Sequence, residues 1–436
     1  MKLLMMDLES SCGMDLCMRA QAHGHDVRYW TPDKTLVGDG LVEKTQDWER
    51  FMQWADLIVL TGNAGYPKGF EKFFTSGYPI FGAPPKAAEL ELDRGKGQEI
   101  LKKHDIPVLP YKVVSSVREA QELLVREGKP FVMKPWGGEA DKAMTAVPRS
   151  VNEGLYILDR WGKKGLFKGQ LMMQEKVKGV EMGISAFFGP GGFVKAKEES
   201  FEHKKFMNDD LGENTGEMGT VIRHVEKSKL FELLLEPLED TLRLLRPVAD
   251  VGLNCIIDED GTPWPLEWTI RLGWPDFCIR QALIQTDPLV WMADLVYGKD
   301  SFSVSKDIAL GVVMAHGDFP REEEKPEEWS GFPFSFEKNF NPNQIHWQQI
   351  MMGEAPKASG GKIKEKATMV TAGQRPLVVT GTGETVEDAR QDAYIAANAI
   401  RWPSNVMYRT DIGKRLEKDL PLAQKHGFAK GMKYER

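Results

Sequence analysis

The stretch Val-Gly-Leu-Asn-Cys-Ile-Ile-Asp-Glu-Asp-Gly-Thr-Pro-Trp-Pro-Leu-Glu-Trp-Thr-Ile-Arg-Leu-Gly, residues 251–273, is the most informative part of the chain. Its apolar runs on either side of Glu259-Asp260-Gly261 predict a β-hairpin, because such a tripeptide favours a tight turn. Side chains alternate between the faces of a strand, so Glu267, Thr269 and Arg271 should share one face. A carboxylate, a hydroxyl and a guanidinium together suit a magnesium ion that bridges phosphates. A half-exposed strand with an Arg–Glu ion pair explains the same residues.

Two segments upstream carry residues that suit a nucleotide site. Residues 131–142, FVMKPWGGEADK, read as a strand that delivers Lys134, followed by a glycine loop that ends in Lys142. The backbone amides and ammonium groups of such a loop can contact phosphates. In residues 174–181, QEKVKGVE, one strand ends and another begins, so the backbone could contact an adenine edge while Glu181 accepts ribose hydroxyls. A solvated Gly-Gly turn would explain the first segment equally well, and a β-hairpin with an acidic tip would explain the second.

A third segment, FEHKKFMNDDLGENTGEMG at residues 201–219, runs from basic residues into a loop of Gly, Asn and Thr. Such a loop can close over an anion and become ordered when the anion binds. His203 by itself is more typical of a structural histidine than of a catalytic acid or base.

The first hundred residues alternate short apolar runs with amphipathic stretches, which predicts a parallel, doubly wound sheet. Ligands of such sheets bind at the carboxyl ends of the strands. The turns at 61–63 and 82–85 are therefore candidate substrate loops. Strands are expected at Lys2–Met6, Asp26–Trp30, Asp56–Leu60 and Pro79–Phe81, and helices at Asp47–Trp54 and Lys68–Ser76.

From about Asp93 the pattern becomes α+β with mostly antiparallel strands. One long helix is expected over Ser228–Arg246, ahead of the hairpin at 251–269. A final β-rich segment should end with a helix over Val386–Ile400. The fold class predicted is therefore a multidomain α/β and α+β protein.

Composition narrows the class of protein. A chain of 436 residues exceeds what one core usually serves, so two to four domains are expected. The net charge of −7 disfavours nucleic acid as the primary partner. The four cysteines form no CxxC pair, which favours reduced thiols, and no run approaches the roughly 20 apolar residues of a membrane span. These observations predict a cytoplasmic, soluble protein without a membrane partner.

Four motifs in the same order resemble those of the phosphoribosylamine-glycine ligase family. EHKKFMNDDLGENTGEMGT resembles the family's DHKR...GPNTGGMG, and LEWTIRLGWPD resembles its EFNxRFGDPE. IALGVVMAHGDFP resembles SLGVVMAxxGYP, and MYRTDIG resembles the xRxDIG ending. The resemblance runs from the strand before Gly82 to about Gly413, which is most of the chain.

The resemblance implies three parts and a two-step reaction. A Rossmann-like domain would occupy residues 1–105, an ATP-grasp domain 106–305 with a lid subdomain at about 115–180, and a small β-rich domain 306–436. ATP would phosphorylate a carboxylate, and an amine would then attack the acyl phosphate to form an amide, with ADP and phosphate released. The implied ligands are ATP, Mg²⁺ or Mn²⁺, glycine or a similar amino acid, and an amine. A monomer is expected.

The resemblance also implies roles for individual residues. Arg271 and Lys142 would be catalytic, and Glu267 and Thr269 would bind the metal. The nucleotide residues would be Arg94, Lys134, Gly137, Gly138, Lys142, Glu175, Lys176, Val177, Glu181 and Lys204. The substrate residues would be Asn63, Asn214, Thr215, Gly216, Met218, Arg271 and Gly273.

Departures from the family pattern occur at the predicted metal site and in the turns that are expected to bind the amine substrate. Thr269 replaces an asparagine ligand, so Asn254, Asp258 or water could complete the metal shell. The family's glycine-rich GxGGREHA turn is replaced by DLESSCGM, which puts two acids, Asp7 and Glu9, where a sugar phosphate should rest. TGNAGY likewise replaces GPExPL.

These departures support the hypothesis that ATP use is kept while the acceptor amine differs. The alternatives are a genuine phosphoribosylamine-glycine ligase of purine biosynthesis and a non-catalytic nucleotide-binding protein on the same fold.

Overall fold

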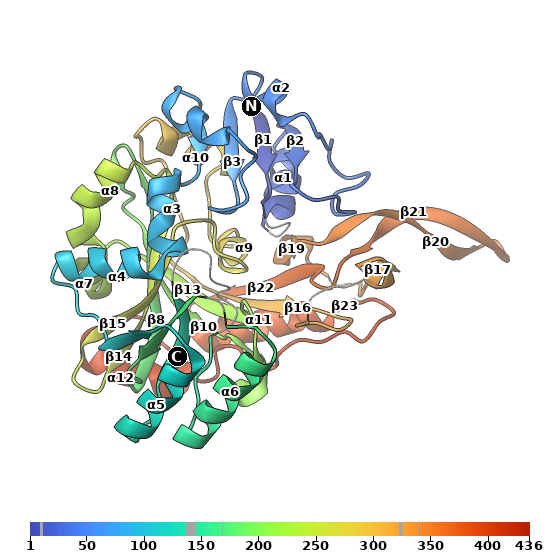
Figure 1. Cartoon of the computed structure of the whole chain (residues 1–436). Coiled ribbons are helices and arrows are strands. Elements are labelled where there is room, and N and C mark those ends of the chain that lie inside the picture. The colour runs from blue at the N-terminus through green and yellow to red at the C-terminus, as the bar shows by residue number, and fades with distance from the viewer. Residues whose placement is uncertain (9–11, 137–144, 168, 322–325, 339) are drawn as a thin grey trace.

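The N-terminal part is a parallel sheet, as its alternating pattern predicts. The computed structural model describes residues 1–8, 12–136, 145–167, 169–321, 326–338 and 340–436 (Figure 1). The sheet has the order β2-β1-β3-β4, and every pairing in it is parallel. Its elements are β1 (Lys2–Met6), α1 (Gly13–Ala22), β2 (Asp26–Trp30), α2 (Trp48–Met52), β3 (Leu57–Leu60), the 3₁₀ helix η1 (Phe70–Thr75) and β4 (Ile80–Phe81).

Two helices, α3 (Pro85–Leu92) and α4 (Arg94–Lys103), lead into a small antiparallel sheet of order β5-β7-β6. Its strands are β5 (Tyr111–Val114), β6 (Val132–Trp136) and β7 (Gln170–Gln174). The helices α5 (Val117–Glu127) and α6 (Val151–Lys163) pack together beside it (Figure 1). Each begins with a serine, Ser116 or Ser150, whose hydroxyl accepts the amide of a glutamate three residues on, which stabilises the first turn.

A nine-stranded sheet forms the centre of the molecule, and the pairings along it are antiparallel. Its main path is β15-β14-β8-β10-β13-β16-β22-β19, and β9 (Gly192–Phe193) pairs with β8. Because β13 pairs with β16, the sheet is continuous across the domain boundary expected at 305/306. The strands are β8 (Gly179–Gly189), β10 (Lys197–Glu202), β13 (Gly219–Val225), β14 (Ala249–Asp258), β15 (Pro263–Thr269), β16 (Ile308–Met314), β19 (Ile345–Trp347) and β22 (Leu377–Gly383).

The single helix expected over Ser228–Arg246 is wrong. The segment instead divides into α7 (Lys229–Leu234), the 3₁₀ helix η3 (Glu236–Leu238) and α8 (Glu239–Leu245). Pro237 explains the break, because proline has no amide hydrogen to donate and its ring clashes with the preceding turn of an α-helix. The hairpin expected after this segment is confirmed as β14 and β15, in which Asn254 faces Glu267.

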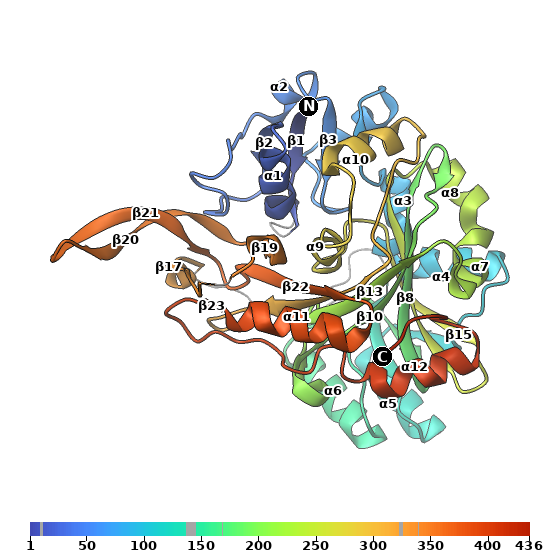
Figure 2. The same ribbon diagram turned by 180° about the vertical axis from the view of Figure 1, so that it is seen from behind.

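Helices cover the far side of the central sheet. α11 (Val386–Asn398) packs on β16 and β22, and α12 (Leu416–Lys425) contacts β8 (Figure 2). The helices α9 (Asp276–Arg280) and α10 (Pro288–Val296) follow the hairpin. The smaller elements are β11 (Lys205–Met207), η2 (Asn208–Asp210), β12 (Leu211–Asn214), η4 (Pro326–Trp329), β17 (Ser330–Pro333), β18 (Ser335–Phe336), η5 (Pro342–Gln344) and β23 (Ile400–Arg401).

A two-stranded arm projects from the body, formed by β20 (Ile350–Ser359) and β21 (Lys362–Ala372) (Figure 1). Its base pairs with β17, and its distal residues, 356–367, are all exposed. The distal part of the arm therefore contributes little to the core, whereas Ile350, Val370 and Ala372 at its base are buried. Among the described residues, no helix has the length and hydropathy to cross a bilayer, and all four cysteines are buried free thiols.

Candidate functional site

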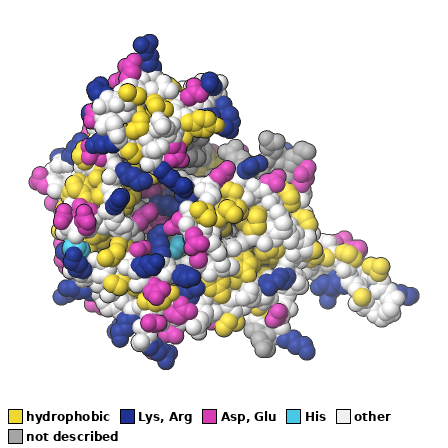
Figure 3. Space-filling model, turned by 90° about the horizontal axis from the view of Figure 1, so that it is seen from below, with side chains coloured by type: hydrophobic (Ala, Val, Ile, Leu, Met, Phe, Trp, Pro, Cys, Tyr) yellow, Lys and Arg dark blue, Asp and Glu magenta, His cyan; other side chains and the backbone are white. Residues whose placement is uncertain are grey.

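A cavity of about 130 Å³ opens on the central sheet where β8, β10, β14 and β15 meet. Its walls include three residues of the predicted strand face, Glu267, Thr269 and Arg271, together with Lys204. Figure 3 shows charged side chains of both signs gathered around a hollow between the upper lobe and the lower body. The hairpin and the loop that were predicted from separate segments thus line one cavity.

Lys204 is the centre of an ion cluster on this wall. Its Nζ lies 2.9 Å from Glu267 Oε1, 3.2 Å from Glu181 Oε1 and 3.2 Å from Glu202 Oε2. Burial opposes the charge of Lys204, but the three carboxylates outweigh it and raise the pKa of the lysine well above its usual value. The charge of Lys204, assisted by that of Lys134, lowers the pKa of Glu267 far below its ordinary value, although burial by itself would raise it. Both groups are therefore ionised at neutral pH.

Two further cations lie near this cluster. Lys134 on β6 is 7% exposed, and burial lowers the pKa of its ammonium group to about 8. Arg94 begins α4 and donates from Nη1 to the carbonyl of Pro135 at 2.8 Å. Burial lowers the pKa of Arg94, while the charge of Glu267 raises it. Lys134 on β6, Arg94 on α4 and Lys204 between β10 and β11 thus bring positive charge toward Glu267.

Arg271 is held by Glu91, a residue that no sequence motif singled out. Glu91 on α3 is 9% exposed and accepts from Arg271 Nε at 3.1 Å and from the Ile270 amide at 2.7 Å. The same carboxylate accepts from Asn63 Nδ2 at 2.6 Å. One buried carboxylate therefore links the predicted catalytic arginine to the predicted substrate asparagine of the N-terminal domain. A lone glutamate in an amphipathic helix gives no signal from which this could be found.

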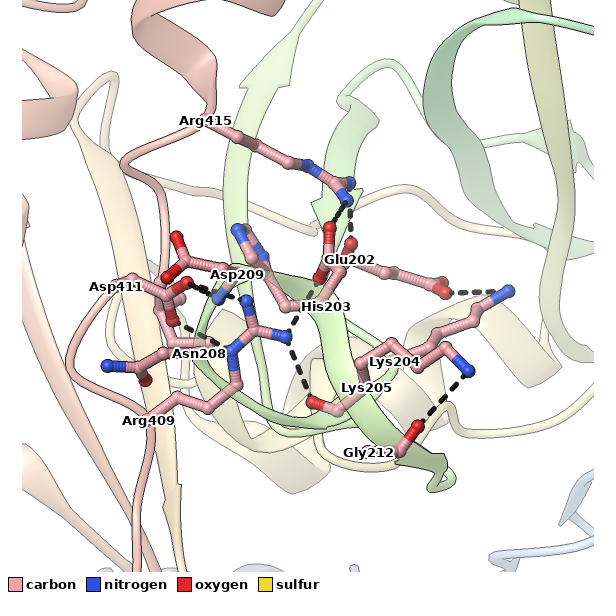
Figure 4. A network of polar contacts seen from close by, with 12 residues as sticks. Glu202, His203, Lys204, Lys205, Asn208, Asp209, Gly212, Arg409, Asp411 and Arg415 are labelled. Atoms are coloured by element: carbon pink, nitrogen blue, oxygen red, sulfur yellow. Dashed lines mark hydrogen bonds and ion pairs between the residues drawn. The ribbon is translucent and has the colours of Figure 1, made fainter. Parts of the chain in front are cut away.

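The late motif MYRTDIG braces the segment that carries Lys204 (Figure 4). Arg409, 2% exposed, donates to the carbonyl of Lys205 at 2.9 Å and pairs with Asp411 at 2.8 Å. Arg415 donates to the carbonyl of Glu202 at 2.6 Å. His203 Nε2 accepts the Gly413 amide, and burial with the nearby arginines keeps its pKa well below the usual value. His203 is thus a neutral structural histidine, as its isolation in the sequence suggested.

The glycine-rich loop lies across the same strand end. Thr215 contacts the carbonyl of Lys204 through its amide at 2.8 Å and its hydroxyl at 2.9 Å. Gly216 lines the cavity, whereas Asn214 is exposed on β12 and Met218 is buried in the core. Gly273 also lines the cavity.

Of the stretch expected to contact adenosine, Glu181 on β8 contacts Lys204, whereas residues 175–177 lie at the β7–β8 connection and do not line the cavity. The carboxylate of Glu175 pairs with Lys129 at 2.8 Å, and Lys176 is exposed and Val177 partly exposed. Their predicted roles stay predictions. The residues Gly137, Gly138 and Lys142 lie outside the described part of the chain.

Candidate metal ligands differ in what they contact. Thr269 and Asn254 both line the cavity. Asp258 instead accepts the amides of Asp260 and Thr262 and the indole of Trp264 at the hairpin turn, so it serves the turn. Within the described residues, no cluster of three or more His, Cys, Asp or Glu is arranged to hold a metal by itself.

The N-terminal turn differs from what its acids suggest. Asp7 is completely buried and accepts from Tyr29 Oη at 2.7 Å and from Thr61 Oγ1 at 2.8 Å. Its carboxylate is thus engaged by two hydroxyls inside the domain. A Cβ at Gly13 would lie 2.5 Å from Asp7 Oδ2, so the glycine makes this packing possible. Glu9, the second acid, lies outside the described residues.

Comparisons with known proteins identify the family of this chain. A family model for the phosphoribosylglycinamide synthetase ATP-grasp (A) domain matches residues 96–243, and one for the C domain of the same synthetase matches residues 309–415. The chain belongs to the phosphoribosylglycinamide synthetase family. Its matched regions contain Lys204, which lines the cavity, and Arg409, which braces the segment that carries Lys204.

Curated relatives of this family cover most of the chain. The chain is 29% identical over 359 residues to "Phosphoribosylamine--glycine ligase" of Ralstonia nicotianae, a match that covers 79% of the chain and 80% of the relative. It is 27% identical over 371 residues to the chloroplastic enzyme of that name from Arabidopsis thaliana, covering 80% of the chain but 66% of the relative.

Solved structures show the same fold. Phosphoribosylamine--glycine ligase from Thermotoga maritima superposes with a TM-score of 0.70 at 20% identity, over 95% of this chain and all of that one. An ADP complex of N5-carboxyaminoimidazole ribonucleotide synthetase superposes with a TM-score of 0.57 at 12% identity, over 91% of this chain and 96% of that one. As a member of this family, the chain is an ADP-forming carbon–nitrogen ligase of the ATP-grasp type.

Proposed function

We propose that the chain is a phosphoribosylamine-glycine ligase, which joins the carboxylate of glycine to the amine of phosphoribosylamine and converts ATP to ADP and phosphate. The observation that carries the proposal is the single cavity in which Lys204, Glu267 and Arg271 meet. The curated relatives carry this activity in their names. The place in purine biosynthesis follows from the same proposal.

The residues present fit a magnesium ion that arrives with ATP. Mg²⁺ is usually held by one or two carboxylates together with substrate phosphates, not by a cage of protein ligands. Glu267 offers an ionised carboxylate that is 42% exposed, and Asn254 and Thr269 supply neutral oxygens on the same cavity wall. Mg²⁺, or Mn²⁺, bound there would neutralise charge on the phosphates.

The protein's own groups account for the rest of the chemistry through position and charge. Lys134, Lys204 and Arg94 supply positive charge where the γ-phosphate would transfer to the glycine carboxylate. Arg271, fixed by Glu91, is placed to stabilise charge on the acyl phosphate and on the phosphate that leaves. The amine of phosphoribosylamine then attacks the acyl carbon, the C–O bond to phosphate breaks, and the amide forms.

The altered-acceptor hypothesis loses one of its supports. It rested partly on acids occupying a phosphate position, but Asp7 is engaged by Tyr29 and Thr61 inside the domain. The names of the relatives also favour the unmodified activity. The replacement of GPExPL by TGNAGY remains, and it brings Asn63 to Glu91.

The test is product formation by purified protein with ATP, Mg²⁺, glycine and freshly generated phosphoribosylamine. We expect ADP and glycinamide ribonucleotide in equal amounts. ADP formed only with a different amine would restore the altered-acceptor hypothesis. ATP-dependent thermal stabilisation without ADP from any amine would indicate the non-catalytic alternative.

A further inference from the structure

Glu217 is a buried carboxylate on the cavity wall. Glu217 is 3% exposed, and its Oε1 has no hydrogen-bond partner among the described residues. The backbone fixes its position, because the next amide, that of Met218, donates to the carbonyl of His203 at 2.8 Å. The family pattern GPNTGGMG has glycine where this chain has Glu217, so the carboxylate is a feature of this chain.

The surroundings of Glu217 are acidic. Burial, and then the charges of Glu202 and Asp276, raise the pKa of Glu217 well above its usual value. The nearby cations are already committed to other acids. Lys204 contacts three carboxylates, and Arg280 pairs with Asp250 at 2.7 Å and with Asp276 at 2.5 Å, as well as with Glu198.

A buried carboxyl beside other acids costs free energy, because on folding it must either take up a proton or be neutralised by a cation. A ligand can supply that cation, and the cavity tells which kind. Arg271 on the same wall suits a carboxylate, so the cavity offers both signs of charge, as a small zwitterion requires. The cavity is also small, with a volume of about 130 Å³.

We propose that Glu217 binds the ammonium group of the amino-acid substrate and so selects an α-amino acid over a carboxylic acid that lacks the amine. The inference rests on the proposed function for the identity of the acid, glycine. It adds a specificity-determining residue at the position where the family pattern has none. Occupation by the ammonium group supplies the positive charge that the protein does not provide.

The test compares Glu217→Gln and Glu217→Gly with wild-type protein, and uses Glu213→Gln, an exposed residue of β12, as the matched control. Steady-state kinetics should show a KM for glycine about 10- to 100-fold higher in both variants of Glu217, as expected for loss of a hydrogen bond to a charged group. The KM for ATP should change less than about threefold, and Glu213→Gln should behave as wild type. The preference for glycine over glycolate, which replaces the ammonium group by a hydroxyl, should shrink by the same factor.

A second readout does not depend on turnover. Glycine should raise the melting temperature of wild-type protein saturated with a non-hydrolysable ATP analogue, and should do so far less for Glu217→Gln. The ligand-free Glu217→Gln protein should itself be more stable than wild type, because glutamine needs neither a buried charge nor the uptake of a proton on folding; a merely structural glutamate would give the reverse. This readout keeps the variant informative even if its turnover is too low to measure.

The outcomes separate the two proposals. If wild-type protein binds glycine through Glu217 but makes no glycinamide ribonucleotide, the acceptor in the proposed function is wrong and the inference stands. If product forms normally and the KM for glycine is unchanged in Glu217→Gln, the inference is overturned alone. A changed requirement for Mg²⁺ with an unchanged KM for glycine would make Glu217 a metal ligand and also overturn it. Absence of any glycine binding by the wild type overturns both.

Discussion

Two acidic residues, Glu267 in the cavity and Asp7 in the N-terminal domain, were both expected at ligand sites from the sequence. In the structure they have different environments. Glu267 is 42% exposed and pairs with Lys204, a cation that ligands can compete with. Asp7 is fully buried and bonded to Tyr29 and Thr61, which are parts of the fold. Solvent exposure and the identity of the hydrogen-bond partner, more than charge, therefore distinguish a ligand-binding carboxylate from a structural one.

The largest expected effect comes from Glu267→Gln. The substitution keeps the shape and removes the charge that would bind metal, so kcat for ADP formation should fall about 10²- to 10³-fold or more, with little loss of stability. A stopped-time ADP assay measures this, and Glu89→Gln, on the surface beside Lys96, is the control. Unchanged turnover would remove Glu267 from the metal site.

The next effect is a pH dependence from Lys134. Its pKa is lowered to about 8 by burial, so in the ligand-free protein about nine-tenths of Lys134 is neutral at pH 9. ATP affinity measured by calorimetry should therefore weaken about tenfold from pH 7 to pH 9. Lys134→Arg, which stays protonated, should flatten this dependence, and an equally steep slope in that variant would assign it to another group.

The same lowered pKa acts in the opposite direction on the stability of the ligand-free protein. Between the folded pKa of about 8 and the unfolded value of about 10.4, the unfolded state binds more protons at this lysine. The contribution of Lys134 to the free energy of unfolding therefore rises with pH across that window. Lys134→Met should remove the rise, as urea unfolding at several pH values would show.

Tyr29→Phe should give the reverse of the Glu267 result. The change removes a 2.7 Å hydrogen bond to buried Asp7 and should lower the free energy of unfolding by about 1–3 kcal/mol. Turnover per folded molecule should stay within about twofold of wild type. Urea unfolding and active-site titration measure both, and a large loss of kcat without loss of stability would place Asp7 at the substrate.

The smallest effect should come from shortening the arm. Ala355 faces Lys366 in the ribbon, so residues 356–365 can be replaced by Asn-Gly without changing the register. The distal arm is exposed and outside the core, so the melting temperature should shift by less than about 2 °C and kcat should be unchanged. A loss of activity would show that the arm supports the site.

Much of the fold could be predicted because its signals are local. Strands such as Lys2–Met6 and the hairpin at 251–269 follow from alternation and from a turn residue within a few positions. The helix over Ser228–Arg246 failed because Pro237 outweighed a continuous apolar pattern. The projection of the arm could not be predicted, because its strand pattern does not show that the distal residues pack against no other element.

The site residues likewise divide into those indicated by local sequence and those whose roles depend on distant contacts. Glu267, Thr269 and Arg271 were found because they lie within five residues of one another, the first two on β15 and Arg271 two residues past its end. Glu91 was missed because its partner Arg271 lies 180 residues away in the sequence. Glu217 was missed because its interest depends on a buried oxygen without a hydrogen-bond partner among the described residues. The bracing of Lys205 by Arg409 across 204 residues is likewise visible only in three dimensions.

The most direct test of the account is oxygen transfer from substrate to phosphate. Glycine labelled with ¹⁸O in its carboxylate is turned over with ATP, Mg²⁺ and phosphoribosylamine, and the phosphate is examined by mass spectrometry. We expect one ¹⁸O atom in each phosphate released, and formation of labelled phosphate about 10²- to 10³-fold slower in Glu267→Gln. Unlabelled phosphate, or formation of AMP in place of ADP, would contradict it.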